Sequence, residues 1–292
     1  WAFFSGASRI ERWGAVVLII VALLATSQFI HESISTGMQG MMLPSYALPV
    51  LPSAFVIWPV LSRRLTNKLR WTLMLVTIFL VCGMWTLLRS DGISGQSVAD
   101  IKWRWAETSE EQLLANTDKE SIVLSSNATT MDSEAEWPGF RGPERDGIVY
   151  GTSISTDWSA SPPSKLWRQP IGPGCSSFAV HGNLIYTQEQ RGEEEVVSCY
   201  NLTTGDPVWK HNDEARFWDS HAGAGPRSTP TLSGGLVYTL GATGILNVLD
   251  APDGAIVWSR NAANDPNTEV PAWGFIHRQL VPADAAVVAC SG

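Results

Sequence analysis

The chain has 292 residues with a formal net charge of −8, and 45% of its residues are hydrophobic. Residues 1–90 hold seven Lys/Arg against two Asp/Glu, a net +5, which leaves −13 for residues 91–292. An acidic distal half without a Lys/Arg-rich run argues against a nucleic-acid partner. Four cysteines with no Cys-x-x-Cys exclude a disulfide-built scaffold and give no sign of a zinc site.

The two ends of the sequence resemble cut points. The chain begins at Trp1 without an initiator Met, and Ala285 to Gly292 reads as a strand that stops in progress. We therefore expect a fragment of a longer protein.

The first 90 residues predict membrane-spanning helices at about 14–30 and 71–88, because both stretches are apolar and just long enough for a bilayer core. A cleaved signal peptide is the alternative for the first, but Gln28 to His31 offers no small-residue cleavage site. Residues 41–61 are apolar too and contain four prolines, so this stretch either spans as a kinked helix or re-enters.

The charged loop at 62–70 predicts the orientation. It carries four positive charges and no acid, so the positive-inside rule places it in the cytoplasm. Everything after Arg89 is then extracytoplasmic, and the lipid bilayer is an expected partner.

Residues 91–136 are interpreted as an extracytoplasmic linker. They contain acids, Ser/Thr/Asn clusters and one short possible helix around 107–114. Trp103 and Trp105 flank Arg104, which fits either an interfacial anchor or an ordinary packing contact.

From Trp137 onward, short β-rich runs are separated by glycines, and two stretches repeat. Tyr186, Gly192, Gly205 and Trp209 recur as Tyr238, Gly244, Gly254 and Trp258, at offsets of 52, 52, 49 and 49 residues. An all-strand repeat of about 45 to 50 residues is typical of a propeller blade. Residues 137–292 are therefore predicted to form an incomplete β-propeller of four-stranded blades.

The runs at 201–209 (NLTTGDPVW) and 250–258 (DAPDGAIVW) resemble the tryptophan-docking repeat of pyrroloquinoline-quinone (PQQ) type propellers, Ala-x-Asp-x-x-Thr-Gly-x-x-x-Trp. The first copy has Cys199 for Ala and Asn201 for Asp, and the second has Val248 for Ala and Asp253 for Thr. The resemblance implies structural docking roles for five residues: Trp167, Trp209, Trp258, Gly205 and Gly254.

The resemblance leaves two functions open. The first is a binding or scaffold module at the bacterial inner membrane, on the periplasmic side, with other envelope proteins as possible partners. The second is a PQQ-dependent dehydrogenase that oxidises an alcohol or sugar, with PQQ and calcium as cofactors. Alcohol-dehydrogenase-like members use adjacent cysteines, which this chain lacks: Cys175, Cys199 and Cys290 are isolated and their disulfide state is open, while Cys82 lies in a predicted span.

No residue is predicted to be catalytic or to bind a metal, and His211 and His221 lack a third ligand. The candidate cofactor ligands lie in the loop 216–227: Arg216, His221 and Arg227, which could dock an anion or a quinone carboxylate. The favoured alternative is that these arginines pair with local acids such as Asp219. Glu193 to Glu195 is interpreted as a solvated charge run at a hairpin tip.

Overall fold

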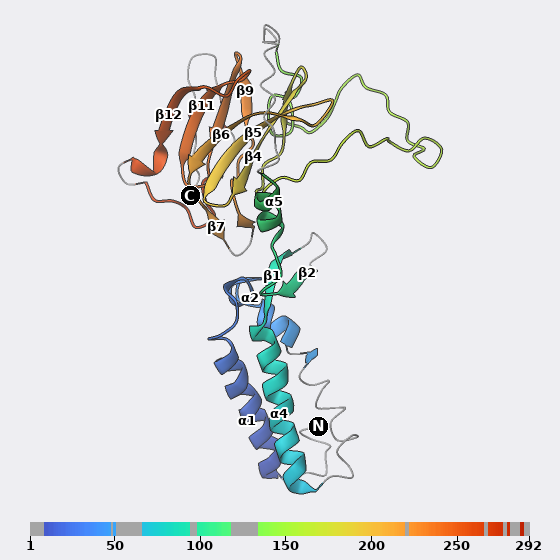
Figure 1. Ribbon diagram of the computed structural model, residues 1–292, viewed down its shortest axis with the longest axis vertical. Helices are drawn as coiled ribbons and strands as arrows, with labels where there is room; N and C mark the ends of the chain where they lie inside the picture. Colours follow the sequence, from blue (N-terminus) through green and yellow to red (C-terminus); the bar gives the residue numbers. More distant parts are fainter. Residues whose placement is uncertain are drawn as a thin grey trace. The chain divides into compact units, whose positions relative to one another are not determined.

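The computed structural model describes residues 9–47, 49–50, 66–93, 98–117, 134–219, 222–265, 268–276, 279–280 and 287–288. The chain divides into two compact units, Trp1–Ala106 and Glu107–Gly292. Figure 1 shows a helical pair in the first and β-sheets in the second. The division falls inside the segment that the sequence analysis interpreted as a linker.

The first unit contains two long helices that run side by side, α1 (Arg9–Thr26) and α4 (Asn67–Thr86). Their inner faces pack Met74, Ile78 and Cys82 of α4 against apolar side chains of α1. Their outer faces remain apolar and exposed, as at Val21 (55% exposed) and Leu80 (68% exposed).

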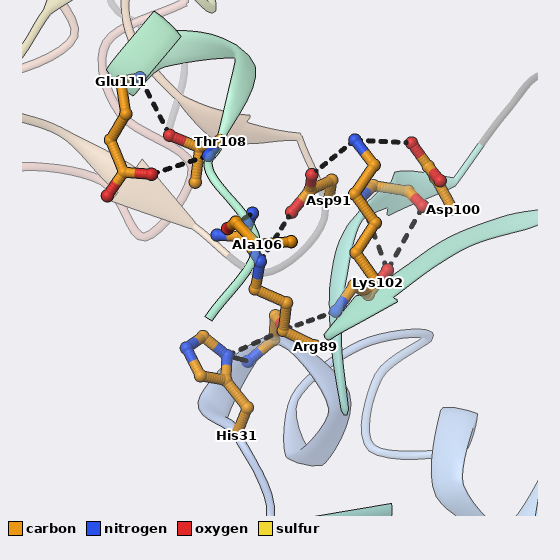
Figure 2. A network of polar contacts seen from close by, with 11 residues as sticks. His31, Arg89, Asp91, Asp100, Lys102, Ala106, Thr108 and Glu111 are labelled. Carbon is orange, nitrogen blue, oxygen red and sulfur yellow. Dashed lines mark hydrogen bonds and ion pairs between the residues drawn. The ribbon is translucent and has the colours of Figure 1, made fainter. Parts of the chain in front are cut away.

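Beyond the helices, the first unit contains the short helix α2 (Glu32–Ser35) and the antiparallel hairpin of β1 (Leu88–Ile93) and β2 (Ala99–Trp103). An apolar cluster that includes Ile34, Met42 and Trp85 supports them. Figure 2 shows the polar contacts along the hairpin, where Lys102 Nζ lies 2.8 Å from Asp91 and 3.3 Å from Asp100.

The predicted spans at 14–30 and 71–88 correspond in position to α1 and α4. Over the described residues, no helix is both long enough and apolar enough to cross a bilayer. Most of the predicted segment 41–61 and residues 62–65 of the basic loop, including Arg63 and Arg64, lie outside the described residues. The spans and their orientation stay predictions.

The second unit opens with helix α5 (Ser109–Thr117), in the region where the sequence indicated a short helix. A capping box starts it: the backbone N–H of Thr108 donates to Glu111 Oε2 (2.6 Å), and the N–H of Glu111 donates back to Thr108 Oγ1 (2.9 Å). Two of the helix's free N-terminal amides are thereby satisfied.

Two four-stranded antiparallel sheets follow, which confirms the prediction of four-stranded blades. The first has the order β3 (Ala179–His181), β4 (Leu184–Arg191), β5 (Glu194–Asn201) and β6 (Pro207–Glu214). The second has β9 (Thr231–Ser233), β10 (Leu236–Leu240), β11 (Ile245–Asp250) and β12 (Ile256–Asn261). Short elements complete the unit: β7 (Trp218–Asp219), β8 (Gly223–Ala224), η1 (Ala262–Asn264), β13 (Gln279–Leu280) and β14 (Val287–Val288).

The strand registers match the sequence repeat. Cys199 pairs with Trp209 in the first sheet and Val248 pairs with Trp258 in the second. Both sheets have a register shift directly after that pair. The equivalent bulges show that the two stretches fold as copies of one unit.

The core of the second unit lies between the two sheets. Ten buried residues form it: Ala179, Tyr186, Val197, Cys199, Val208, Trp209, Leu232, Val237, Leu249 and Ala251. Alternation along the strands sends every second side chain of the first sheet toward the second sheet.

Candidate functional site

The first docking contact joins Trp167 to the turn after β5. The indole Nε1–H of Trp167 donates to the carbonyl oxygen of Leu202 (2.8 Å). The ring lies against Gly205, where a Cβ would come within 2.6 Å of an indole carbon. Gly205 has φ +79°, so both its backbone conformation and the proximity of the ring require glycine.

The second contact repeats the first between the two sheets. Trp209 Nε1–H donates to the carbonyl oxygen of Ala251 (2.9 Å), and its ring lies against Gly254, which has φ +73°. A Cβ on Gly254 would overlap the indole ring. The acceptors Leu202 and Ala251 are 49 positions apart, the same offset that separates the two glycines.

Where the docking turns depart from the family pattern, other groups satisfy the turn. Asn201 replaces Asp, and its side-chain Oδ1 accepts the N–H groups of Thr203 (2.9 Å) and Thr204 (3.0 Å). Asp253 replaces Thr, and its Oδ1 accepts the N–H of Ala255 (2.8 Å). An amide or carboxylate oxygen can therefore organise either turn.

Trp258 occupies the register position of Trp209, but 44% of it is exposed whereas Trp209 is 3% exposed. Its neighbours Ile256 and Val257 on β12 are each 58% exposed. Among the described residues, β12 thus presents an uncovered apolar surface.

Arg216 binds a carboxylate of its own unit. Its Nη1 lies 2.8 Å from Glu110 Oε1 and its Nη2 lies 3.1 Å from Glu110 Oε2. Nη1 also donates to the carbonyl oxygen of Gly192 (2.5 Å), so α5 is fastened to the β4–β5 hairpin. These hydrogen bonds to Glu110 are the main reason that the pKa of Arg216 is raised.

Arg227 is buried and also paired. Its Nη2 donates to Asp219 Oδ2 (2.5 Å) and to the carbonyl oxygen of Gly223 (2.6 Å), and its guanidinium lies 5.2 Å from the centre of the Phe217 ring. His221 lies outside the described residues. In this structure the terminal nitrogens of Arg216 and Arg227 bind protein oxygens. Their role as cofactor ligands stays a prediction.

Glu195 is the residue that the sequence analysis misjudged. It was interpreted as part of a solvated charge run, but it is 4% exposed, whereas Glu193 and Glu194 are exposed. Both faces of β5 are buried from Glu195 onward, and strand alternation places Glu195 on the face of Val197 and Cys199, which packs against the second sheet.

In the described part of the chain, no group of His, Cys, Asp or Glu is arranged to hold a metal ion. Cys82 and Cys199 are buried and Cys175 is exposed, all three as free thiols, while Cys290 lies outside the described residues. Burial raises the pKa of the Cys199 thiol, so it is held as an unreactive thiol in the core.

A comparison with protein-family models finds a match over the region that contains the two four-stranded sheets. Residues 156–291 match the family model described as outer membrane protein assembly factor BamB. The match covers most of the distal unit, whose two four-stranded sheets resemble the blades of PQQ-like repeat β-propellers. A comparison with curated protein sequences finds no significant match.

Two solved structures are each similar to a part of this chain. BamB from Moraxella catarrhalis is 22% identical, with a TM-score of 0.23, over 33% of this chain and 24% of that one. A europium-containing methanol dehydrogenase is 14% identical, with a TM-score of 0.25, over 31% of this chain and 16% of that one. The chain therefore spans about a quarter or less of these two proteins.

We expect Trp209→Ala to lower the free energy of unfolding by roughly 3 to 5 kcal/mol, because it empties a buried aromatic site and removes the indole hydrogen bond. Trp258→Ala, at the same register position but half exposed, should cost less than about 1 kcal/mol. Denaturant unfolding of the full chain measures both. Equal losses would contradict the assigned docking contact.

A second pair of variants isolates the close approach of ring and backbone. Gly254→Ala and Gly234→Ala both place a side chain at positive φ, which costs roughly 1 to 2 kcal/mol in each case. Only at Gly254 does the new Cβ meet a ring, since nothing lies within 4 Å of the position at Gly234. The unfolding midpoint should therefore fall further for Gly254→Ala, and the reverse order would refute ring docking there.

Proposed function

We propose that this chain is part of a bacterial inner-membrane protein whose PQQ-like propeller lies on the periplasmic side and acts as a binding or scaffold module for other envelope proteins. The observation that carries the scaffold assignment is the pairing of Arg216 with Glu110 and of Arg227 with Asp219. The cations best suited to an anionic cofactor instead stabilise the fold.

The membrane part of the proposal is supported by the outer faces of α1 and α4. Large apolar side chains there are more than half exposed: Val17, Ile20, Val21, Leu24, Phe79 and Leu80. A contiguous apolar face of this kind is unfavourable in water and favourable in lipid.

Aromatic side chains beyond the helices also support it. Trp103 and Trp105 stack with ring centres 5.1 Å apart and stay largely exposed. Between them, Arg104 Nη1 donates to the carbonyl oxygen of Thr86 (3.0 Å), at the C-terminal end of α4. Exposed tryptophans next to a helix end are typical of a membrane–water interface.

Topology can be tested with single-cysteine variants at Ser62 and Ser153, in a chain whose four native cysteines are replaced by alanine. With a membrane-impermeant thiol reagent on intact cells, we expect labelling at position 153 and none at position 62 until the membrane is disrupted, because a loop with four cations resists translocation. Labelling at position 62 without labelling at position 153 would indicate the opposite orientation and would contradict the proposal.

The scaffold assignment is tested by titrating the purified full chain with PQQ in the presence of calcium. We expect the absorbance of PQQ to stay unchanged, because both guanidiniums already bind carboxylates. Stoichiometric binding that is lost in Arg216→Ala or Arg227→Ala would overturn the assignment in favour of the dehydrogenase. The topology result does not depend on this outcome.

A further inference from the structure

Glu195 connects the two sheets through a buried carboxyl group. On β5 it pairs with Gln190 of β4 and with Asp213 of β6, and the carboxyl groups of Glu195 and Asp213 both bond to the second blade. Its Oε1 accepts the backbone N–H of Ala242 (2.9 Å), which lies in the turn between β10 and β11. A side chain of the first sheet therefore holds the backbone of the second.

The other oxygen of this carboxyl group has no polar partner. Glu195 Oε2 is buried and forms no hydrogen bond within the described residues. It lies against Gly241, where a Cβ would overlap it. A carboxylate placed this way lacks the hydrogen bonds that usually compensate burial of a charge.

The charges around Glu195 do not compensate it either. Asp213 is the adjacent acid on β6, and it is held by Asn247 of β11 (2.6 Å) and lies 3.3 Å from His211. Arg227, in the loop after β8, is the nearby cation, but its Nη2 is bound to Asp219. No cation in the described part of the chain forms an ion pair with Glu195.

We propose that Glu195 is a proton-dependent latch between the two sheets. The carboxyl group holds the β10–β11 turn against β5 through the Ala242 N–H. Loss of its proton leaves a buried charge on an oxygen without a hydrogen-bond partner, and this charge favours opening of the turn. A buried negative charge beside Asp213 favours any state in which water reaches the turn.

The ionisation of Glu195 is consistent with this role. Burial raises its pKa to about 7, and Asp213 adds to the rise while the Ala242 N–H and Arg227 oppose it. The ordinary pKa is 4.5, so between pH 4.5 and 7 the folded state holds a proton that the unfolded state has lost. The stabilisation is complete below pH 4.5 and is lost as the pH rises toward 7.

The test follows denaturant unfolding of the full chain by tryptophan fluorescence between pH 5 and 8. For the wild type, we expect the unfolding equilibrium constant to rise by up to about tenfold per pH unit until pH 7 and then to level off. In Glu195→Gln, which keeps an acceptor for Ala242 but cannot ionise, this rise should disappear. Glu193→Gln, at the exposed hairpin tip, should retain it.

An unchanged rise in Glu195→Gln would overturn the proposal. If that variant fails to fold, Asp213→Asn decides, because removing the neighbouring charge should move the end of the rise to lower pH. An Asp213→Asn profile identical to wild type would then refute the latch. Hydrogen exchange of the amides at 240–246, corrected for its intrinsic pH dependence, should become faster as the pH rises toward 7, which would locate the opening at the turn itself.

Discussion

The distal unit depends on one contact that occurs twice: an indole ring stacked on a glycine with positive φ, with the indole N–H bound to a carbonyl three residues before that glycine. Trp167 makes it with Gly205 and Trp209 makes it with Gly254. Each contact ties the end of one repeat to the turn of the next. Because a blade packs mainly on its neighbours, this contact largely determines how successive repeats pack together.

The same arrangement makes burial of polar groups between the two sheets energetically unfavourable. Near the docking contact the interface is apolar, with Tyr186 beside Trp209 at 5.8 Å between ring centres. Farther along the strands it becomes polar, with Glu195, Asp213 and Asn247 in place of aliphatic residues. The apolar end supplies packing energy, while the polar end contains a carboxyl group whose pKa is raised by burial.

The two arginines that the sequence indicated as anion ligands are each paired with a carboxylate of the second unit. Arg216 fastens α5 to the hairpin of the first blade, and Arg227 stabilises the loop between the blades. Within the described residues, both arginines thus make the contacts of structural cations.

The sequence alone predicted the repeat and the strand content, because these follow from local signals: alternating apolar runs, turn glycines and a tryptophan at a fixed offset. The docking roles came from the resemblance to PQQ-type propellers, and the described residues show the contact for Trp167 and Trp209. It also located the helices α1 and α4 and indicated α5. It could not assign the partners of Arg216 and Arg227 completely. The acid that binds Arg216 lies 106 positions away, at Glu110, and no local pattern encodes such a contact.

The tertiary structure decided which members of a pattern are buried. Trp209 and Trp258 are equivalent in sequence, yet only Trp209 is covered, because a second sheet lies against its blade. Glu193, Glu194 and Glu195 are identical as residues, yet only Glu195 faces another sheet. Burial depends on what packs against a face, and that is a property of segments distant in the chain.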